Sequence, residues 1–457
     1  MAPRLPPSPP TRGLATALRV AFVVCLVAGA LAPVATASPR PVPACGPCDR
    51  SLTGAARAHG VDATVERSTA TMRVHENGSA TWTVADRLNA AAAERLGRND
   101  SLRRAVATDA VAVHDARLLS ARVDGDTLRL RYRTPNVATE TPGGVLRVDY
   151  FRDDPGARVV SGLGADRLTL VAPEGRVVGT ALPGAEASGR RMTVTAFRSH
   201  GDGPFVTLVP EGSALAPVWS LVAVAVAVAP VVGRNLLLLV ALPSLLFAGC
   251  LAALSWGVGR AVDGRTLDAE RGGLAVAGLG VVLLAHPLYA GGVSILGSTE
   301  PVLLAGAAGL VALGGALAVP AVRRDLSTPR LVGLVALAFG VAVAVGYALR
   351  ALPVADRTFF AGAWVVGQVL PALPVYAAVV AGDAAARGEL RRGLLVAVGA
   401  FALATLGTFS IASHGGTLYG LAVALVLAGA VVGTLAGTPL FVLGYALPSS
   451  DGSPGRD

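Results

Sequence analysis

The pattern of apolar and polar positions divides the chain near residue 212. Before that point, short stretches of alternating apolar and polar residues lie between clusters of Gly, Pro and Asp, which is typical of β-strands. After it, charge-free apolar stretches cover 212–233, 235–259, 331–349, 358–382 and 393–450. A helix needs about 20 consecutive apolar residues to cross a bilayer. We therefore expect a β-rich domain over 38–212 and a transmembrane helical domain over 213–447.

Eight apolar segments are candidates for membrane-spanning helices. They cover 214–233, 235–258, 272–292, 301–322, 331–349, 358–381, 393–411 and 417–437. Eight crossings from an exterior domain would leave the loops 260–271, 323–330 and 383–392, with nine Arg residues, on the outside. Arg-rich loops favour the cytoplasm, and a single crossing over 214–258 places them there. The sequence therefore predicts an α-helical polytopic membrane bundle of seven or eight spans.

The amino-terminal segment has the three parts of a secretory signal peptide. Arg residues at positions 4, 12 and 19 precede an apolar run over 20–32, and Ala35-Thr36-Ala37 follows that run. Small residues in this arrangement form a signal-peptidase site. We expect cleavage after Ala37, so that 1–37 is a signal peptide. At the other end of the chain, 448–457 is a short polar tail.

Two β-hairpins are predicted in the 38–212 domain. Asn77-Gly78 connects strands over 71–75 and 80–84, and Asp124-Gly125 connects strands over 120–123 and 127–132. Both dipeptides favour tight hairpin turns. Further strands are expected at 145–151, 167–171, 192–197 and 205–209. Eight short strands predict a mostly β, sandwich-like domain, with a helical insertion over 88–111 that is rich in Ala, Arg and Leu.

Two sequons agree with an exterior position for this domain. Asn77-Gly78-Ser79 and Asn99-Asp100-Ser101 both match the acceptor sequence for N-glycosylation. Asn77 and Asn99 are accordingly candidate glycosylation sites. Together with the signal peptide, the sequons favour a multi-pass protein of the cell membrane whose amino-terminal domain is exterior.

The formal charge of +9 does not by itself indicate a nucleic-acid partner. All 39 basic residues are Arg, and they are interspersed with 30 acidic residues along the chain. Domains that bind nucleic acids gather their basic residues in a patch or stripe. No such stripe stands out in the sequence, so we expect no nucleic-acid partner.

Cys45-Gly46-Pro47-Cys48 is the most distinctive short motif in the chain. The same four residues form the dithiol active site of thioredoxins, where the motif follows a buried strand and opens a helix. Here the Pro-rich stretch 39–44 precedes it. Three interpretations of Cys45 and Cys48 stay open: a structural disulfide, a thiol redox site, and half of a metal site. The chain has no second Cys pair to complete a zinc site, so we predict no metal.

Polar residues are few within the apolar segments. Ionisable groups in transmembrane helices usually mark a functional path, and the best polar candidates are His286, Gln368 and His414. Each of them also fits a hydrogen-bonded packing or interfacial residue, and no cofactor is predicted. Pro residues at 230, 243, 371 and 374 interrupt the segments, as in transporters that have broken helices.

Three short motifs of the β-rich domain resemble a known group of proteins. They are Val65-Glu66-Arg67-Ser68-Thr69, the hairpin sequence over 73–84, and Ala172-Pro173-Glu174-Gly175. With the layout of helices after them, they resemble uncharacterised haloarchaeal multi-pass membrane proteins that have a signal peptide and a β-rich exterior domain. The resemblance implies no established activity. The charge balance departs from acidic haloarchaeal exteriors, because 38–213 holds 23 Arg against 20 Asp and Glu.

These features favour a non-enzymatic envelope protein. In this interpretation the exterior domain contacts an envelope or membrane protein partner, and the helical block is an anchor or scaffold in the lipid bilayer. A transporter or channel subunit is the first alternative. An exterior thiol redox protein that uses Cys45 and Cys48 is the second.

Overall fold

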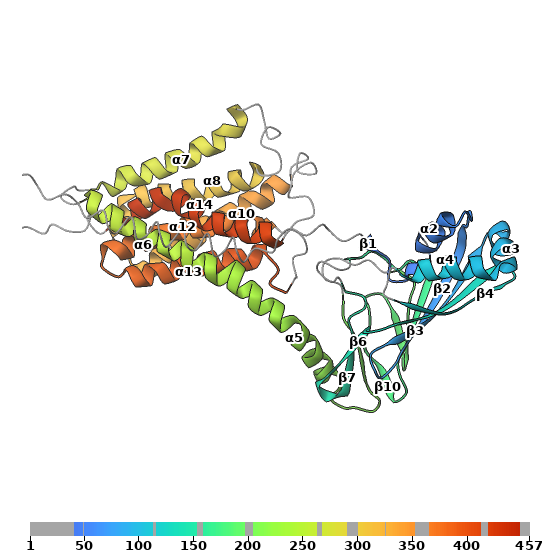
Figure 1. Ribbon diagram of the computed structural model, residues 1–457. Coiled ribbons are helices and arrows are strands. Elements are labelled where there is room, and N and C mark those ends of the chain that lie inside the picture. Colours follow the sequence, from blue (N-terminus) through green and yellow to red (C-terminus); the bar gives the residue numbers. More distant parts are fainter. Residues whose placement is uncertain are drawn as a thin grey trace, which may run out of the picture. The chain divides into compact units, whose positions relative to one another are not determined.

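The computed structural model describes residues 41–48, 50–112, 116–152, 159–196, 204–262, 267–289, 300–324, 326–351, 365–412 and 419–447. The chain forms two compact units (Figure 1): a β-rich unit that extends to Val232, and a helical unit that begins at Gly233. The signal peptide predicted over 1–37 and the tail predicted over 448–457 lie outside the described residues.

The largest sheet of the β-rich unit has seven strands in the order β11-β12-β9-β2-β3-β5-β4. Neighbouring strands are antiparallel except for β2 and β9, which are parallel. The strands are β2 (Val65–Val74), β3 (Ala80–Leu88), β4 (Arg117–Asp124), β5 (Thr127–Thr134), β9 (Arg167–Val171), β11 (Glu186–Ser188) and β12 (Arg191–Val194).

Smaller elements complete this unit. A four-stranded sheet has the order β10 (Arg176–Thr180), β13 (Val206–Pro210), β7 (Val145–Val148) and β6 (Ala138–Thr141), and β1 (Pro41–Val42) pairs in parallel with β8 (Val159–Val160). The helices are η1 (Gly46–Cys48), α2 (Arg50–Ala58), α3 (Ala90–Arg98), α4 (Asp100–Ala112) and η2 (Pro142–Gly144).

Both predicted hairpins are confirmed, as β2–β3 and β4–β5. Gly78 has φ +76°, and a Cβ at this position would overlap the carbonyl oxygen of Ala138, so the first turn requires glycine. The predicted helical insertion is also confirmed, as α3 and α4. Strands β6, β10 and β11 were not predicted, because they are short and several of their residues are exposed on both faces.

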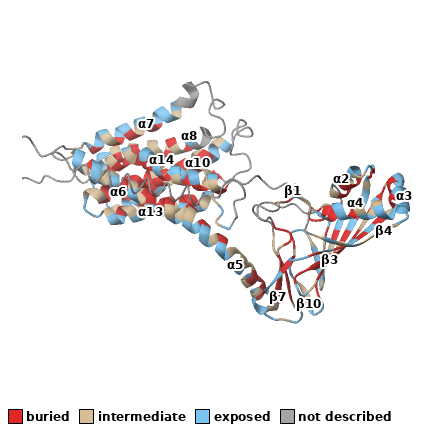
Figure 2. Ribbon diagram, in the orientation of Figure 1, coloured by how far each residue is buried: buried red, intermediate tan, exposed pale blue. Residues whose placement is uncertain are grey.

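One face of the seven-stranded sheet forms the core of the unit. Buried and exposed residues alternate along its strands (Figure 2). Met72, Trp82 and Tyr132 are fully buried, and the rings of Trp82 and Tyr132 stack at 5.7 Å between centroids. The same hydrophobic cluster contains Leu52 of α2 and Leu208 of the four-stranded sheet. Helices and the second sheet therefore cover this face. The period of two along each strand directs the other set of side chains to the opposite face.

Helix α5 (Ala216–Asn235) begins in the β-rich unit. Ala223 packs with Val145 and Val209 of the four-stranded sheet, and the hydroxyls of Thr207 and Ser220 are 2.9 Å apart. Because of these contacts, the β-rich unit extends beyond the boundary at residue 212 that the sequence indicated.

Helix α5 continues through a π-helical turn, η3 (Leu236–Ala241), into α6 (Leu242–Val262), so that Ala216–Val262 is one helix of 47 residues. Two separate spans at 214–233 and 235–258 would need a turn at Arg234 and Asn235. No turn forms there, since Asn235 has helical φ and ψ of −69° and −39°. The separation of these residues into two spans was therefore wrong.

The helical unit contains α7 (Ala269–Tyr289), α8 (Glu300–Ala318), α9 (Pro320–Arg324), α10 (Thr328–Arg350), α11 (Val365–Val369), η6 (Leu370–Ala372), α12 (Leu373–Ala386), α13 (Leu390–Thr408) and α14 (Tyr419–Ala446). Within the part of the chain that the structure describes, five helices are long and apolar enough to cross a membrane. They are Ala216–Val262, Thr328–Arg350, Val365–Ala386, Leu390–Thr408 and Tyr419–Ala446.

Glycine allows close approach between the helices of this unit. A Cβ at Gly314 of α8 would lie 2.6 Å from the backbone nitrogen of Ala277 on α7. On α14, a Cβ at Gly444 would overlap the carbonyl oxygen of Val379 on α12. Small residues favour helix association in lipid, where burial of apolar surface gives little net stabilisation. The Gly-rich and Ala-rich sequence thus produces tightly packed helix pairs.

Candidate functional site

Cys45 and Cys48 form a disulfide within the β-rich unit. Cys45 is 0% exposed and Cys48 1% exposed, and the backbone nitrogen of Cys45 donates a hydrogen bond to the carbonyl of Leu163 at 2.9 Å. The turn η1 includes three of the four motif residues, Gly46 to Cys48, and the helix α2 follows it. The strand before the motif, β1, has only two residues. Burial of both sulfurs limits their access to another thiol, and this geometry suits a structural bond.

The two sequon asparagines take part in local backbone structure. The Oδ1 atom of Asn77 accepts hydrogen bonds from the backbone and the hydroxyl of Ser79, at 3.2 and 2.8 Å. The Oδ1 atom of Asn99 accepts from the backbone nitrogen of Leu102 at 3.0 Å and thereby caps α4. Both side chains are exposed. Their glycosylation stays a prediction.

Of the polar candidates of the apolar segments, Gln368 is the one whose side chain the structure describes. Gln368 lies in α11, just before the 3₁₀ turn η6, and is half-buried. His286 is a residue of α7, and His414 lies outside the described residues. Within the described ranges, no group of three His, Cys, Asp or Glu residues could hold a metal ion.

Asp383 is an ionisable residue that the sequence analysis missed. It lies inside α12 with 1% of its surface exposed, and its Oδ1 atom accepts a hydrogen bond from Nε of Arg387 at 2.9 Å. Arg387 also approaches the carbonyl of Leu326 at 3.5 Å. The charge-free run ends at residue 382, so Asp383 was assigned to a loop. In the structure the helix continues four residues further, to Ala386, and Arg387 is its C-cap.

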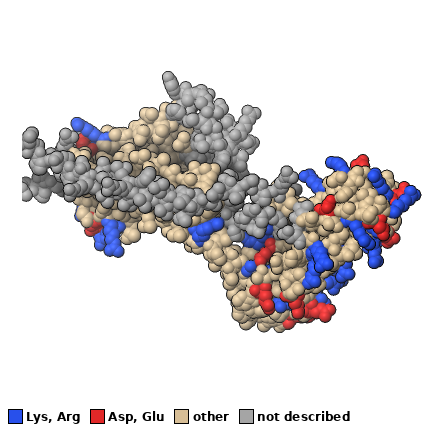
Figure 3. All heavy atoms as spheres, in the orientation of Figure 1, with Lys and Arg blue, Asp and Glu red and all other residues tan. Residues whose placement is uncertain are grey.

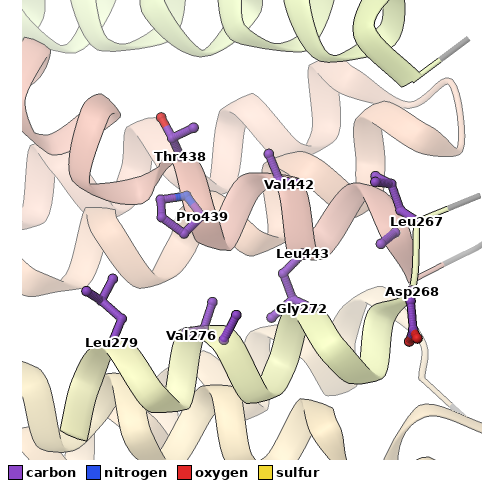
Figure 4. A pocket seen from close by; sticks show the side chains of 11 residues that line it. Leu267, Asp268, Gly272, Val276, Leu279, Thr438, Pro439, Val442 and Leu443 are labelled. Carbon is purple, nitrogen blue, oxygen red and sulfur yellow. The ribbon is translucent and has the colours of Figure 1, made fainter. Parts of the chain in front are cut away.

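Two grooves in the helical unit are lined mainly by apolar side chains. The first, between α7 and α14, has a volume of ≈ 450 Å³, within the range of roughly 300–1,000 Å³ for ligand pockets. Figure 4 shows Val276, Leu279 and Leu443 along it, with Asp268 at one end. The Asp268 carboxylate accepts hydrogen bonds from the backbone of Glu270 and Arg271, so it caps α7. The second groove, ≈ 240 Å³, lies beside Pro371 and is similarly apolar. Neither groove has converging polar groups that could orient a substrate.

The open face of the seven-stranded sheet carries Arg and Thr side chains. On β5, Arg129, Arg131 and Arg133 are exposed between buried neighbours. The strand register places further residues of the same face beside them: Arg67, Thr69, Thr71 and Arg73 on β2, Thr81, Thr83 and Arg87 on β3, Arg117 and Arg122 on β4, Arg167 and Thr169 on β9, and Arg191 and Thr193 on β12. We call this surface the Arg/Thr face.

A hollow lies on the Arg/Thr face over β2, β3 and β5, toward the end of β2 that leads into the Asn77-Gly78 turn. Its lining consists of Thr71, Arg73, His75, Thr81, Thr83 and Arg131. No carboxylate contributes to this lining, whereas Glu66, Asp124 and Asp126 lie at the ends of strands and near Arg87 or Arg129. Among the described residues, Arg73 and Arg131 have no ion-pair partner. The positive charge at the hollow is therefore not compensated by an ion pair among the described residues, whereas that of Arg87 and Arg129 is.

The pKa of His75 is affected by the positive charge around the hollow. Its Nε2 atom lies 2.8 Å from the hydroxyl of Thr81. Partial burial lowers the pKa of His75 below its usual 6.5, and the positive charges of Arg133, Arg73 and Arg131 lower it further. The guanidinium of Arg133 is held in place by two hydrogen bonds to the Ser79 hydroxyl, at 3.1 and 2.8 Å.

No protein-family model, curated protein or solved structure matches this chain.

The Arg/Thr face was not predicted as a patch. The alternation of Arg129, Arg131 and Arg133 with apolar residues is visible in the sequence. The face becomes continuous only because β2, β9 and β12, which are distant in sequence, complete the same sheet. In the view of Figure 3, blue and red side chains are numerous on the β-rich unit, and the visible helical unit is largely tan.

Proposed function

We propose that the protein is a non-enzymatic envelope protein of the cell membrane, with a β-rich exterior domain that binds a surface component and a helical unit that serves as its anchor. The Arg/Thr face is the observation that carries this proposal, since its exposed, hydrogen-bonding side chains are available for contact. The predicted signal peptide and the sequons at Asn77 and Asn99 support an exterior position for this domain.

The packing of the helical unit supports an anchoring role. Its helices contact one another through glycines such as Gly314, Gly382 and Gly444. Among its described residues, Asp383 is the only charged residue that is buried, and Arg387 pairs with it. A path for ions or polar substrates needs several polar groups that face a common cavity. The grooves in this unit are instead apolar and suit lipid chains.

We propose seven membrane crossings, by α6, α7, α8, α10, α11–α12, α13 and α14. The ion pair of Arg323 with Glu270 (3.4 Å) and the contact of Arg387 with Leu326 (3.5 Å) join the Arg-rich loops at one end of the unit. The positive-inside rule favours the cytoplasm for that end. Seven crossings from an exterior domain satisfy it and leave the carboxyl terminus in the cytoplasm.

Photo-crosslinking in intact cells tests the binding function. The chain has no Lys, so amine-directed crosslinkers are unsuitable, and a benzophenone amino acid should replace Thr83 on the Arg/Thr face. The matched control carries it at Ala91, an exposed residue of α3. We expect a discrete adduct after detergent extraction from the Thr83 position only. Absence of an adduct, or equal labelling from both positions, would contradict the proposal.

A transporter or channel is the second candidate, because the helix over 365–386 is interrupted. The 3₁₀ turn Leu370–Ala372 separates α11 from α12, and Gln368 lies directly before it. Broken helices of this type form ion and substrate sites in transporters. Solute flux into vesicles that contain the full chain, reduced by Gln368→Leu and unchanged by Thr438→Val, would favour this candidate over the anchor.

A further inference from the structure

We infer that the Arg/Thr face binds an acidic polysaccharide of the envelope, a linear polymer with repeated carboxylate groups and many hydroxyls. This inference rests on the proposed binding function and adds the chemical class of the partner. It depends on the charge of the face, the regular spacing of its groups, and its lack of a large apolar centre.

The charge of the hollow suits carboxylates. Arg73 and Arg131 both line it, and the part of the chain that the structure describes offers neither of them an ion-pair partner. A guanidinium group can donate two parallel hydrogen bonds to one carboxylate, an interaction that combines charge with fixed geometry. An anionic group at the hollow would also reduce the repulsion among these guanidinium groups.

The spacing of the face suits a polymer. Side chains on one face of a strand are about 7 Å apart, and neighbouring strands are about 4.8 Å apart. Arg129, Arg131 and Arg133 therefore form a row along β5, and Thr83, Thr71 and Thr169 form a row across β3, β2 and β9. A chain with repeated anions can contact several Arg residues at once, and this multivalency strengthens binding when single contacts are weak.

The threonine rows suit a carbohydrate. A hydroxyl group both donates and accepts hydrogen bonds, as do the hydroxyls of a sugar ring. Thr71, Thr81 and Thr83 place three such groups in the hollow beside the guanidinium groups. A polymer with acidic groups and hydroxyls thus meets complementary partners in the same small area.

A protein partner fits this face less well. Protein interfaces contain a desolvated centre with aromatic or large apolar side chains. The lining of the hollow contains none. On the edge strand β4, Leu119 lies in a bulge and is 48% exposed. Single exposed apolar residues of this kind are common on surfaces.

The test measures binding of fluorescent polygalacturonate to the full chain in nanodiscs of zwitterionic phosphatidylcholine. We expect the double substitution Arg73→Glu and Arg131→Glu to weaken binding at least about tenfold at low salt. The matched control, Arg98→Glu with Arg104→Glu, changes two exposed residues on α3 and α4 and should alter affinity less than about twofold. Raising the salt from about 0.1 M to about 1 M shortens the Debye length from about 10 Å to about 3 Å, and should also weaken binding.

Two further measurements separate loss of binding from unfolding of the domain. Charge reversal could unfold the domain, so Arg73→Gln with Arg131→Gln should reproduce the loss with an unchanged melting temperature. In the unsubstituted protein, polygalacturonate should raise the pKa of His75, and neutral dextran should not.

Four results would overturn the inference. Three of them are equal losses for the face and control variants, double-stranded DNA that binds as tightly as polygalacturonate, and anionic-lipid nanodiscs that abolish binding by occupying the same residues. A protein adduct at Thr83 without polygalacturonate binding would overturn the inference and leave the proposed function intact. Polygalacturonate binding without any adduct in cells would contradict the proposed function and would leave only the affinity of the face for an acidic polymer.

Discussion

Gly382 on α12 lies directly against the carbonyl oxygen of Phe441 on α14, so close that a Cβ at residue 382 would overlap that oxygen. The backbone of Tyr445 is 3.0 Å from the same position. The contact joins two of the most closely packed helices of the unit, and only glycine permits it. Helix propensity would favour Ala at this position, so close packing determines the residue.

We predict that Gly382→Ala destabilises the helical unit by about 1–3 kcal/mol, because the added methyl group forces α12 and α14 apart. The matched control is Gly399→Ala on α13, an exposed position with no atom within 4 Å of the added Cβ. That change should raise stability by up to about 1 kcal/mol through helix propensity. Thermal unfolding in detergent measures both changes, and equal stability of the two variants would contradict the packing argument.

Substitutions of Asp383 and of Arg387 should lower the stability of the helical unit by different amounts. The Asp383 side chain is 1% exposed, and that of Arg387 is 36% exposed. Arg387→Met removes a cation that pairs with a buried carboxylate and should cost about 3 kcal/mol. Asp383→Asn leaves a guanidinium that can contact water, and should cost about 1 kcal/mol or less.

The exposed pair Arg392 and Glu389 provides the control for this comparison. Arg392→Met should not change stability measurably, since exposed pairs contribute little. Denaturation in mixed micelles gives all three values. A larger loss for Asp383→Asn than for Arg387→Met would show that the carboxylate has another role.

The pKa of His75 should lie below 6.5 and should rise when a neighbouring positive charge is removed. Arg133→Gln removes the neighbouring charge that contributes most, and Arg104→Gln on α4 is the control. NMR titration of histidine labelled at Cε1 measures the pKa, because the chain has only six His residues. A His75 pKa at or above 6.5, or an equal change in the control, would contradict the account of the hollow.

The sign of the linked pH effect follows from the lowered pKa. Between the native pKa of His75 and 6.5, the unfolded chain binds more protons than the folded chain. The contribution of His75 to stability therefore decreases as the pH falls through 6.5. His75→Asn should remove this part of the pH dependence of unfolding.

The disulfide should stabilise the β-rich unit without taking part in exchange. It closes a loop of four residues, for which loop entropy predicts about 2 kcal/mol. Cys45→Ser with Cys48→Ser should lower stability by that amount, whereas Cys250→Ser should leave the β-rich unit unchanged. Rapid reduction of the folded protein by thioredoxin would instead support a redox role.

Local signals in the sequence were sufficient for several elements. The Asn77-Gly78 and Asp124-Gly125 dipeptides predicted the two hairpins, and the alternation of apolar and polar residues predicted that Met72 and Trp82 are buried. These features depend on residues close together in the chain. The parallel pairing of β2 with β9 joins residues about a hundred positions apart, and no local pattern specifies it.

Two residues show where a charge-based prediction of spans loses accuracy. Arg234 led to a predicted turn, yet its guanidinium lies 4.2 Å from the ring centre of Tyr419 and the helix continues. Asp383 led to a predicted helix end, yet its pairing with Arg387 keeps it within α12. In each case an interaction within the fold accommodates a charge that the sequence alone marks as a boundary.

The exclusive use of Arg gives the Arg/Thr face a permanent charge. A guanidinium group stays protonated throughout the physiological pH range, whereas a lysine amine loses its charge in alkaline conditions or on acetylation. Of the groups that line the hollow, His75 is therefore the one whose protonation varies in the physiological range. Such a surface would keep its positive potential through changes of environment that would discharge a surface built from lysine.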